Sequence, residues 1–145
     1  MTESRERSHY PYYTSITTRW MDNDIYGHIN NVTYYSFFDT VANDYLIHQG
    51  GLDIHNADTV GYIVASSCQY HASISHPANI EAGFRVNRLG NSSVEYGIGI
   101  FREGEALASA NGTFTHVFVD RATDRATPIP DQLRAALAAA MPGTG

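Results

Sequence analysis

The fold is decided by residues 19–39, which read RWMDNDIYGHINNVTYYSFFD. Polar groups that can take part in chemistry crowd the residues just before an aromatic, amphipathic segment. Apolar residues then recur at steps of three and four, the spacing of one face of an α-helix. They are Tyr34, Phe37, Phe38, Val41 and Tyr45. The pattern predicts a helix from about Asn31 to Gln49, which the pair Gly50-Gly51 ends.

The start of this predicted helix suits an anionic group. The first turn of a helix has unpaired N–H groups and a partial positive charge, so it holds an oxyanion or a carboxylate well. Asn30 or Asn31 would cap the start, because an Asn side-chain oxygen accepts one of these N–H groups. Asp24 and His28 come just before it. An acid and an imidazole are therefore expected beside the positive end of the helix.

The spacing of these residues resembles a known family. Residues 19–34 follow the order Arg-Trp-x-Asp-x-Asp-x-x-Gly-His-x-Asn-Asn-x-x-Tyr. This order resembles the opening of the hotdog-fold acyl thioesterases related to 4-hydroxybenzoyl-CoA thioesterase, with the plant acyl-ACP thioesterases as more distant relatives. Three later segments extend the similarity over nearly the whole chain. They are Ser66-Ser67-Cys68-Gln69-Tyr70, Arg88-Leu89-Gly90-Asn91-Ser92-Ser93 and Val119-Asp120-Arg121-Ala122-Thr123.

The fold class follows from the pattern, and the specific fold follows from the resemblance. Residues 1–9 are expected to form a flexible tail, and residues 10–145 a single domain. A strand over Tyr10–Trp20 precedes the long helix, and a helix over Gln132–Met141, capped by Asp131, ends the chain. Further strands are expected at Tyr62–Ala72, Asn79–Arg88, Ser93–Phe101 and Leu107–Val119. This order predicts an α+β protein. The resemblance implies the hotdog fold, an antiparallel sheet wrapped around a long central helix.

Composition excludes several classes of function. No apolar run reaches the length of a membrane span, and the polar N-terminus lacks the core of a signal peptide, so we expect a cytoplasmic protein without a membrane partner. The net charge of −6 argues against a nucleic-acid partner. All basic residues are Arg, which excludes Schiff-base chemistry on a lysine. The single cysteine, Cys68, allows no intrachain disulfide and is expected in the core.

The catalytic roles are implied by the resemblance. The family's catalytic acid is the second Asp of Asp-x-Asp, and a main-chain N–H seven residues later polarises the thioester. These positions correspond to Asp24 and Asn31. The carboxylate can attack the thioester to give an anhydride or activate a water, and the sequence leaves both routes open. His28 is expected to assist as an orienting or charge-stabilising group, and Asp22 to hold the loop.

Substrate binding is predicted for two further groups of residues. In the family, the turn at Arg88, Asn91, Ser92 and Ser93 lies near the phosphates of coenzyme A, and a guanidinium with hydroxyl donors suits that task. The pocket near the thioester is expected to be lined by Asn30, Tyr34, Ser66, Ser67 and Tyr70. We expect neither a metal nor a cofactor, since His71, His76 and His116 lack metal-ligand spacing.

The residue spacing does not match two other motifs, the EF-hand calcium loop and the motif of the hotdog hydratases. An EF-hand loop starting at Asp22 would place Tyr26 and Thr33 at liganding positions. The hotdog hydratases have Asp-x-Asn-Pro-x-His, whereas this chain has three residues between Asp24 and His28 and no Asn-Pro.

The expected function is hydrolysis of an acyl-CoA by a homodimer or homotetramer with sites at the subunit interfaces. The alternatives are a non-catalytic acyl-thioester binding module and an acyl-ACP thioesterase. The acidic chain disfavours the second, because carrier proteins are acidic too.

Overall fold

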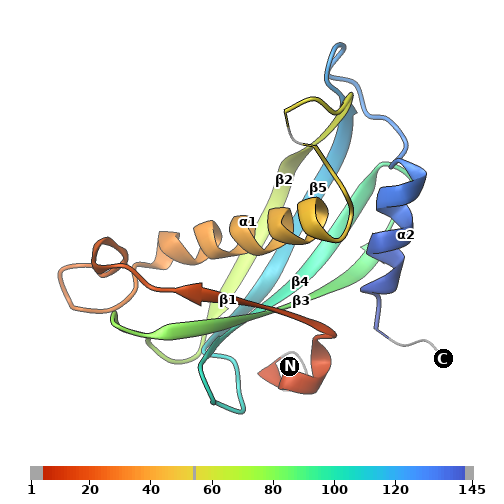
Figure 1. Ribbon diagram of the computed structural model, residues 1–145. Helices are drawn as coiled ribbons and strands as arrows, with labels where there is room; N and C mark the ends of the chain where they lie inside the picture. The colour runs from red at the N-terminus through yellow and green to blue at the C-terminus, as the bar shows by residue number, and fades with distance from the viewer. Residues whose placement is uncertain (1–4, 54, 143–145) are drawn as a thin grey trace.

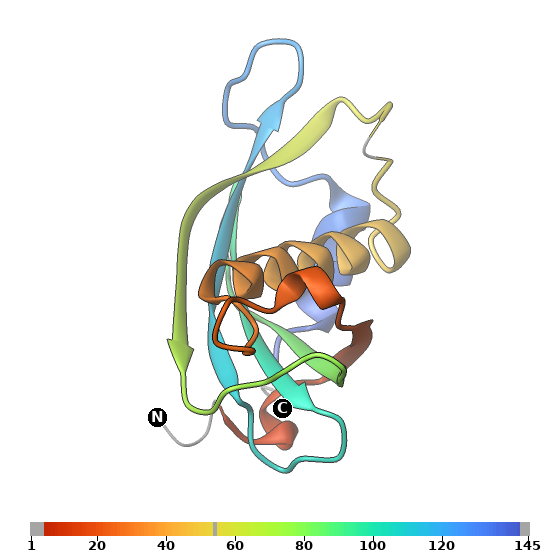
Figure 2. The same ribbon diagram turned by 90° about the vertical axis from the view of Figure 1, so that its left-hand side faces the viewer.

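A computed structural model describes residues 5–53 and 55–142 of the chain. One antiparallel sheet has the strand order β1-β3-β4-β5-β2, and the helix α1 (Asn31–His48) crosses one of its faces (Figures 1 and 2). The strands are β1 (Tyr12–Thr17), β2 (Thr59–Tyr70), β3 (Asn79–Leu89), β4 (Ser93–Arg102) and β5 (Ala110–Asp120). This arrangement confirms the predicted α+β class and the sheet that curves around a central helix.

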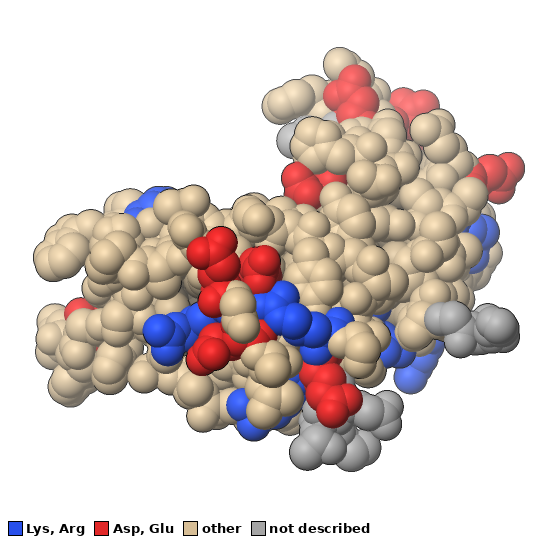
Figure 3. Space-filling view, turned by 60° about the horizontal axis from the view of Figure 1, so that its bottom comes forward, with Lys and Arg blue, Asp and Glu red and all other residues tan. Residues whose placement is uncertain are grey.

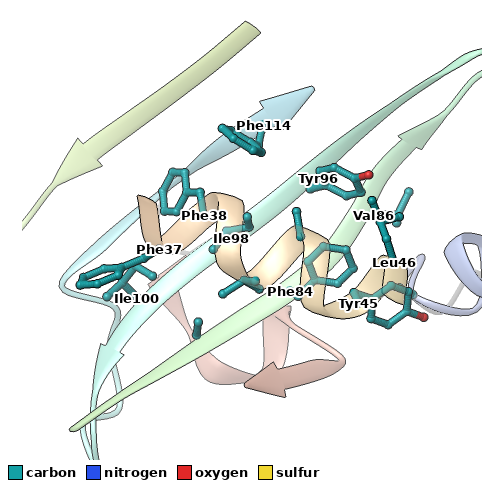
Figure 4. Close-up of a cluster of buried hydrophobic side chains, with 14 of the residues drawn as sticks. Phe37, Phe38, Tyr45, Leu46, Phe84, Val86, Tyr96, Ile98, Ile100 and Phe114 are labelled. Atoms are coloured by element: carbon teal, nitrogen blue, oxygen red, sulfur yellow. The ribbon is translucent and has the colours of Figure 1, made fainter. Parts of the chain in front are cut away.

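The aromatic face of α1 builds the core. Its buried residues are Tyr34, Phe37, Phe38, Val41, Ala42, Tyr45 and Leu46. Figure 4 shows several of them facing inward-pointing side chains of β3, β4 and β5. The Tyr45 ring stacks on Phe84, with the ring centroids 4.6 Å apart. The helix begins at the predicted Asn31, and Asn30 caps it, because its Oδ1 accepts a hydrogen bond from the N–H of Val32 at 3.1 Å.

The C-terminal helix α2 (Asp131–Ala139) begins one residue earlier than predicted, and Asp131 is not its cap. Pro130 is the N-cap, with an extended backbone (φ −56°, ψ 145°), and no side chain caps the helix. Asp131 lies inside the first turn, where its charge still suits the helix dipole. The helix packs against the end of α1, since the Tyr45 hydroxyl donates to the carbonyl of Ala136 at 2.6 Å. Neither α-helix in the described part of the chain is long and apolar enough to cross a bilayer.

Within the expected tail over residues 1–9, residues 5–9 contact later parts of the chain, while residues 1–4 lie outside the described residues. The carbonyl of Arg5 accepts a hydrogen bond from the N–H of Ala108 at 2.8 Å, and Arg7 pairs with Glu81 at 2.5 Å. A short 3₁₀ helix, η2 (Arg7–His9), connects to β1. Polar composition alone suggested a tail, but the Arg side chains have partners far along the chain. Figure 3 shows the acidic and basic side chains of the lower face gathered in one band.

Tyr10 packs against the sheet apart from the main core. It forms a small second cluster with Phe101 and Ala108, which is separate from the core under α1. A Cβ atom at Gly99 would lie 2.7 Å from the Tyr10 ring. The absence of a side chain at Gly99 therefore allows the Tyr10 ring to approach the strand closely.

A buried histidine makes the fold sensitive to acid. His116 is 2% exposed, and its Nδ1 lies 2.8 Å from the hydroxyl of Tyr96. Burial lowers the pKa of His116 from 6.5 to about 4. Because the folded pKa is below the unfolded one, the unfolded chain binds a proton between these pH values that the folded chain does not.

We therefore expect the free energy of unfolding to fall by about 3 kcal/mol between pH 7 and pH 4 through this group. Urea unfolding at a series of pH values measures the loss. In His116→Gln, which keeps a hydrogen-bonding partner for Tyr96, the loss between these pH values should shrink by that amount. An unchanged pH dependence in the variant would disprove the assignment to His116.

Candidate active site

The loop between β1 and α1 is fixed by Asp22. Its carboxylate is 1% exposed, accepts a hydrogen bond from the N–H of Arg19 at 2.8 Å and pairs with the Arg19 guanidinium at 2.8 Å. Its carbonyl accepts a hydrogen bond from the N–H of Asn30 at 2.9 Å. Residues Trp20–Asp22 form a 3₁₀ helix, η3, so β1 stops earlier than predicted. Asp22 therefore has the loop-holding role predicted for it.

The loop presents Asp24 at its tip. The Oδ1 atom accepts hydrogen bonds from the N–H groups of Tyr26 at 2.8 Å and His28 at 3.3 Å. The N–H of Asp24 donates to the carbonyl of His28 at 2.8 Å. Gly27 closes the turn with φ +80°, a conformation that glycine adopts at little cost. The carboxylate is thus held through Oδ1, and no described residue donates a hydrogen bond to Oδ2.

The same loop is joined to the connection between β2 and β3. The N–H of Ile29 donates to the carbonyl of Ile74 at 2.7 Å, and the side chain of Asn23 bonds the backbone N–H of His76 at 2.9 Å. These bonds bring residues 71–76, which follow β2, next to the loop and the start of α1. Figure 2 shows this end of the molecule, with the loop below the start of α1.

A hollow of about 320 Å³ lies where these segments meet. Five predicted site residues line it together, namely Asp24, His28, Asn31, Tyr34 and Tyr70. The Tyr70 hydroxyl donates to the carbonyl of Asn31 at 3.1 Å, and its ring meets Tyr34 edge to face, with the centroids 5.2 Å apart. Burial raises the pKa of Tyr34 to about 12, so this hydroxyl stays neutral. The hollow combines one carboxylate with two tyrosine side chains.

The start of α1 offers a free donor at this hollow. The Oδ1 atom of the cap Asn30 accepts a hydrogen bond from the N–H of Val32. The N–H of Thr33 donates to the carbonyl of Asn30 at 2.9 Å. Among the described residues, none accepts a hydrogen bond from the N–H of Asn31. Such an unpaired N–H at a helix start attracts an oxyanion.

Other predicted residues lie outside this hollow. Asn30 serves as the helix cap. Ser66 and Ser67 are exposed on β2, where the Ser67 hydroxyl lies 2.8 Å from that of Thr113.

The turn that carries Arg88, Asn91, Ser92 and Ser93 lies beside α2, at the other end of α1 from Asp24 (Figure 1). Arg134 donates to the carbonyls of Gly90 and Asn91 at 2.9 and 2.8 Å, which fixes the turn there. Within one chain, the structure therefore does not bring this turn to Asp24.

Sequence reasoning missed two features beside Asp24. His71 lines the hollow, although it was considered only as a metal ligand. The signal for it was its place directly after Tyr70, at the end of a segment that resembles the family.

A second, more apolar hollow of about 480 Å³ also borders Asp24, and the exposed side chains of Trp20, Met21 and Ile25 line it. Within the described ranges, no three His, Cys, Asp or Glu side chains gather as a metal site.

A family model and several solved structures are similar to this chain. Residues 18–137 match the family model of the thioesterase-like superfamily. The PA5185 protein of Pseudomonas aeruginosa is 54% identical over 94% of this chain and 96% of that chain, and the two structures superpose with a TM-score of 0.93. The PA2801 protein of the same organism, proposed to be a thioesterase, is 28% identical over 86% of this chain and 96% of that chain, with a TM-score of 0.81.

A more distant structure shares the fold. It is the 1,4-dihydroxy-2-naphthoyl-CoA thioesterase Slr0204 of Synechocystis. It is 14% identical over 88% of this chain and 94% of that chain, with a TM-score of 0.79. The predicted hotdog fold is therefore confirmed.

Proposed function

Because the chain belongs to the thioesterase-like superfamily, we propose that it hydrolyses an acyl-CoA thioester to a free acid and coenzyme A. One observation carries the proposal. Asp24 and Asn31, whose N–H has no acceptor among the described residues, both line a single hollow at the start of α1. Thioester hydrolysis needs these two parts, a nucleophile or base and a donor for the oxyanion.

In this proposal, a backbone N–H stabilises the oxyanion, and a side chain acts as the nucleophile or base. The thioester oxygen would accept a hydrogen bond from the N–H of Asn31 as negative charge develops on it, and a donor of this kind contributes about 10²–10³ in rate. The bond from Tyr70 to the carbonyl of Asn31 keeps the first turn of α1 in place. Asp24, fixed through Oδ1, attacks the carbonyl carbon or takes a proton from the attacking water. His28 borders the same space as a supporting polar group.

The two hollows beside Asp24 suggest how the substrate lies. The hollow lined by Trp20, Met21 and Ile25 suits an apolar acyl group, because burying each CH₂ contributes about 0.8 kcal/mol. The polar hollow with Tyr34 and Tyr70 then suits the thioester itself.

We further propose that coenzyme A reaches the site across a subunit interface. The exposed Arg88 makes no ion pair with another described residue, so its guanidinium is available for a phosphate. Its turn can approach Asp24 only from a partner subunit, since the two lie at opposite ends of α1 in one chain (Figure 1).

The strand β2 supports a dimer. It lies at one edge of the sheet and pairs only with β5. Tyr62, Ile63 and Val64 on it are 47%, 41% and 59% exposed, and most of its residues on both faces are accessible. A long unpaired edge with exposed apolar residues is a template for pairing with another chain. We propose that a second copy covers β2.

Val64→Lys should break this dimer, because the substitution places a charge in the apolar interface. Light scattering on a size-exclusion column should give the mass of a dimer or tetramer for the wild-type protein and of a smaller species for the variant. An unchanged mass for the variant would place the interface elsewhere. Thr40→Lys, at an exposed position of α1, serves as the control for the added charge.

Release of free thiol from a panel of acyl-CoAs tests the function. The proposal predicts turnover that follows enzyme concentration, with a preference among the acyl groups. Binding without release on every acyl-CoA would instead indicate an acyl-thioester binding module. Release from acyl-carrier-protein substrates alone would indicate the acyl-ACP thioesterase.

A further inference from the structure

We propose that His71 is a second catalytic residue, the base that takes a proton from water in the step that frees the acid. This inference rests on the proposed thioesterase function and completes its chemistry. If Asp24 attacks the thioester, its carboxylate becomes part of an anhydride and loses its negative charge. Another group must then accept the proton of the water that cleaves the anhydride.

The backbone holds His71 at the hollow. The residue directly follows β2 and borders the same space as Asp24 and Asn31. Its N–H and that of Ala72 both donate to the carbonyl of Ser109, at 2.8 and 3.1 Å. The side chain is therefore carried by a fixed backbone.

A buried amide orients the imidazole ring. The Nε2 atom of His71 lies 2.6 Å from Oδ1 of Asn111, which is 8% exposed and belongs to β5. An amide oxygen only accepts hydrogen bonds, so Nε2 carries the proton in this contact. The other ring nitrogen, Nδ1, then has the free lone pair of a base. In enzymes that activate a nucleophile with a side-chain base, a third group commonly orients the base through a hydrogen bond.

His28 is less suited to this role. Its backbone N–H and carbonyl both bond Asp24, which fixes the main chain. The side chains of His28 and His71 are both exposed, but no described residue forms a hydrogen bond with the ring of His28. Of the two imidazoles at the hollow, His71 alone has a buried partner that sets its tautomer.

The reaction balances in two steps. First, an oxygen of Asp24 bonds to the thioester carbon, the C–S bond breaks, and coenzyme A leaves as the thiolate. Next, His71 takes a proton from water, whose oxygen bonds to the acyl carbon. The bond between the acyl carbon and the Asp24 oxygen breaks, which frees the acid and regenerates the carboxylate. The imidazolium returns its proton to solvent, where the thiolate is also protonated.

Rapid mixing of the full-length protein with an acyl-CoA that the wild type turns over tests this sequence of steps. In His71→Ala, we expect steady-state turnover to fall by about 10²-fold. A burst of about one thiol per active site should remain, because the first step is intact. Hydroxylamine should trap the accumulated anhydride as a hydroxamate at Asp24 or as the acyl hydroxamate, both visible by mass spectrometry. Added imidazole should restore part of the turnover.

Two results would overturn the role of His71. One is unchanged turnover in His71→Ala, and the other is a loss of turnover without a burst and without rescue by imidazole. His48→Ala, an exposed histidine near the other end of α1, is the matched control and should behave as the wild type. A wild-type protein that releases no thiol from any acyl-CoA would instead refute the proposed function, so the two failures are distinguishable.

Discussion

We expect Asp24→Asn to lower thiol release by about 10⁴-fold and to leave acyl-CoA binding nearly unchanged, as for a charged group that acts as a unit with its neighbours. The amide has the shape of the carboxylate, and its oxygen can still accept hydrogen bonds from Tyr26 and His28. The loop therefore keeps its fold. The amide neither attacks a thioester nor takes a proton, so only the chemical step is lost. Steady-state kinetics and calorimetric binding of a thioether analogue measure the two effects.

Asp39→Asn is the matched control for this experiment. Asp39 is exposed on α1, and its side chain bonds Asn43 within the same helix at 3.1 Å. The same chemical change at this position should leave turnover and binding as in the wild type. Full activity in Asp24→Asn would refute the assignment of the carboxylate. Loss of binding in parallel with turnover would show that the substitution had damaged the hollow.

Replacing Phe38 with Ala is expected to lower the free energy of unfolding by about 3–5 kcal/mol. The Phe38 side chain is fully buried, and its ring packs edge to face against Phe114 of β5 and Tyr35 of α1, with centroids 6.3 and 5.9 Å apart (Figure 4). Removing the ring leaves a cavity between helix and sheet that the curved sheet cannot fill. Since a domain of this size has a total stability of about 5–15 kcal/mol, the loss is a large fraction.

Urea unfolding of Phe38→Ala, followed by circular dichroism, measures this loss. Ser36→Ala is the control, because Ser36 is exposed on the opposite side of the same helix turn. Its expected effect stays within about 0.5 kcal/mol. A loss below about 1 kcal/mol in Phe38→Ala would mean that α1 contributes less to the core than its burial indicates.

The sequence was most informative where one periodicity dominates. The steps of three and four from Tyr34 to Tyr45 predicted α1 and its buried face, because a helix on a sheet needs one apolar stripe. The cap was predicted to be Asn30 or Asn31, because few side chains satisfy a helix start, and the structure assigns it to Asn30. The resemblance to the hotdog thioesterases pointed to Asp24 and Asn31 together, and both residues line the hollow.

Prediction was weaker where distant segments meet. His71 lies at the hollow because of its bond to Asn111 and the bonds of its backbone to Ser109, partners that no local pattern reveals. The contacts of Arg5 and Arg7 with residues far along the chain overrode the polar composition of the N-terminus. Asp131 and Pro130 are both plausible helix starts, and the proline took the cap position.

The turn at Arg88 illustrates a different limit. Hydrogen bonds from Arg134 hold the turn beside α2. Within one chain, the turn therefore lies at the other end of α1 from Asp24. Its predicted contact with coenzyme A depends on a second subunit, whose placement is not encoded in any local pattern. The exposed strand β2 is the feature of one chain that points to such a partner.

A crystal structure of Asp24→Asn with an intact acyl-CoA bound would show where the thioester lies. We predict that the thioester oxygen lies about 2.7–3.1 Å from the N–H of Asn31, with the carbonyl carbon facing the side chain at position 24. The acyl group should extend toward Trp20 and Ile25. A thioester bound away from the start of α1, in any subunit of the assembly, would refute the roles of Asp24 and Asn31.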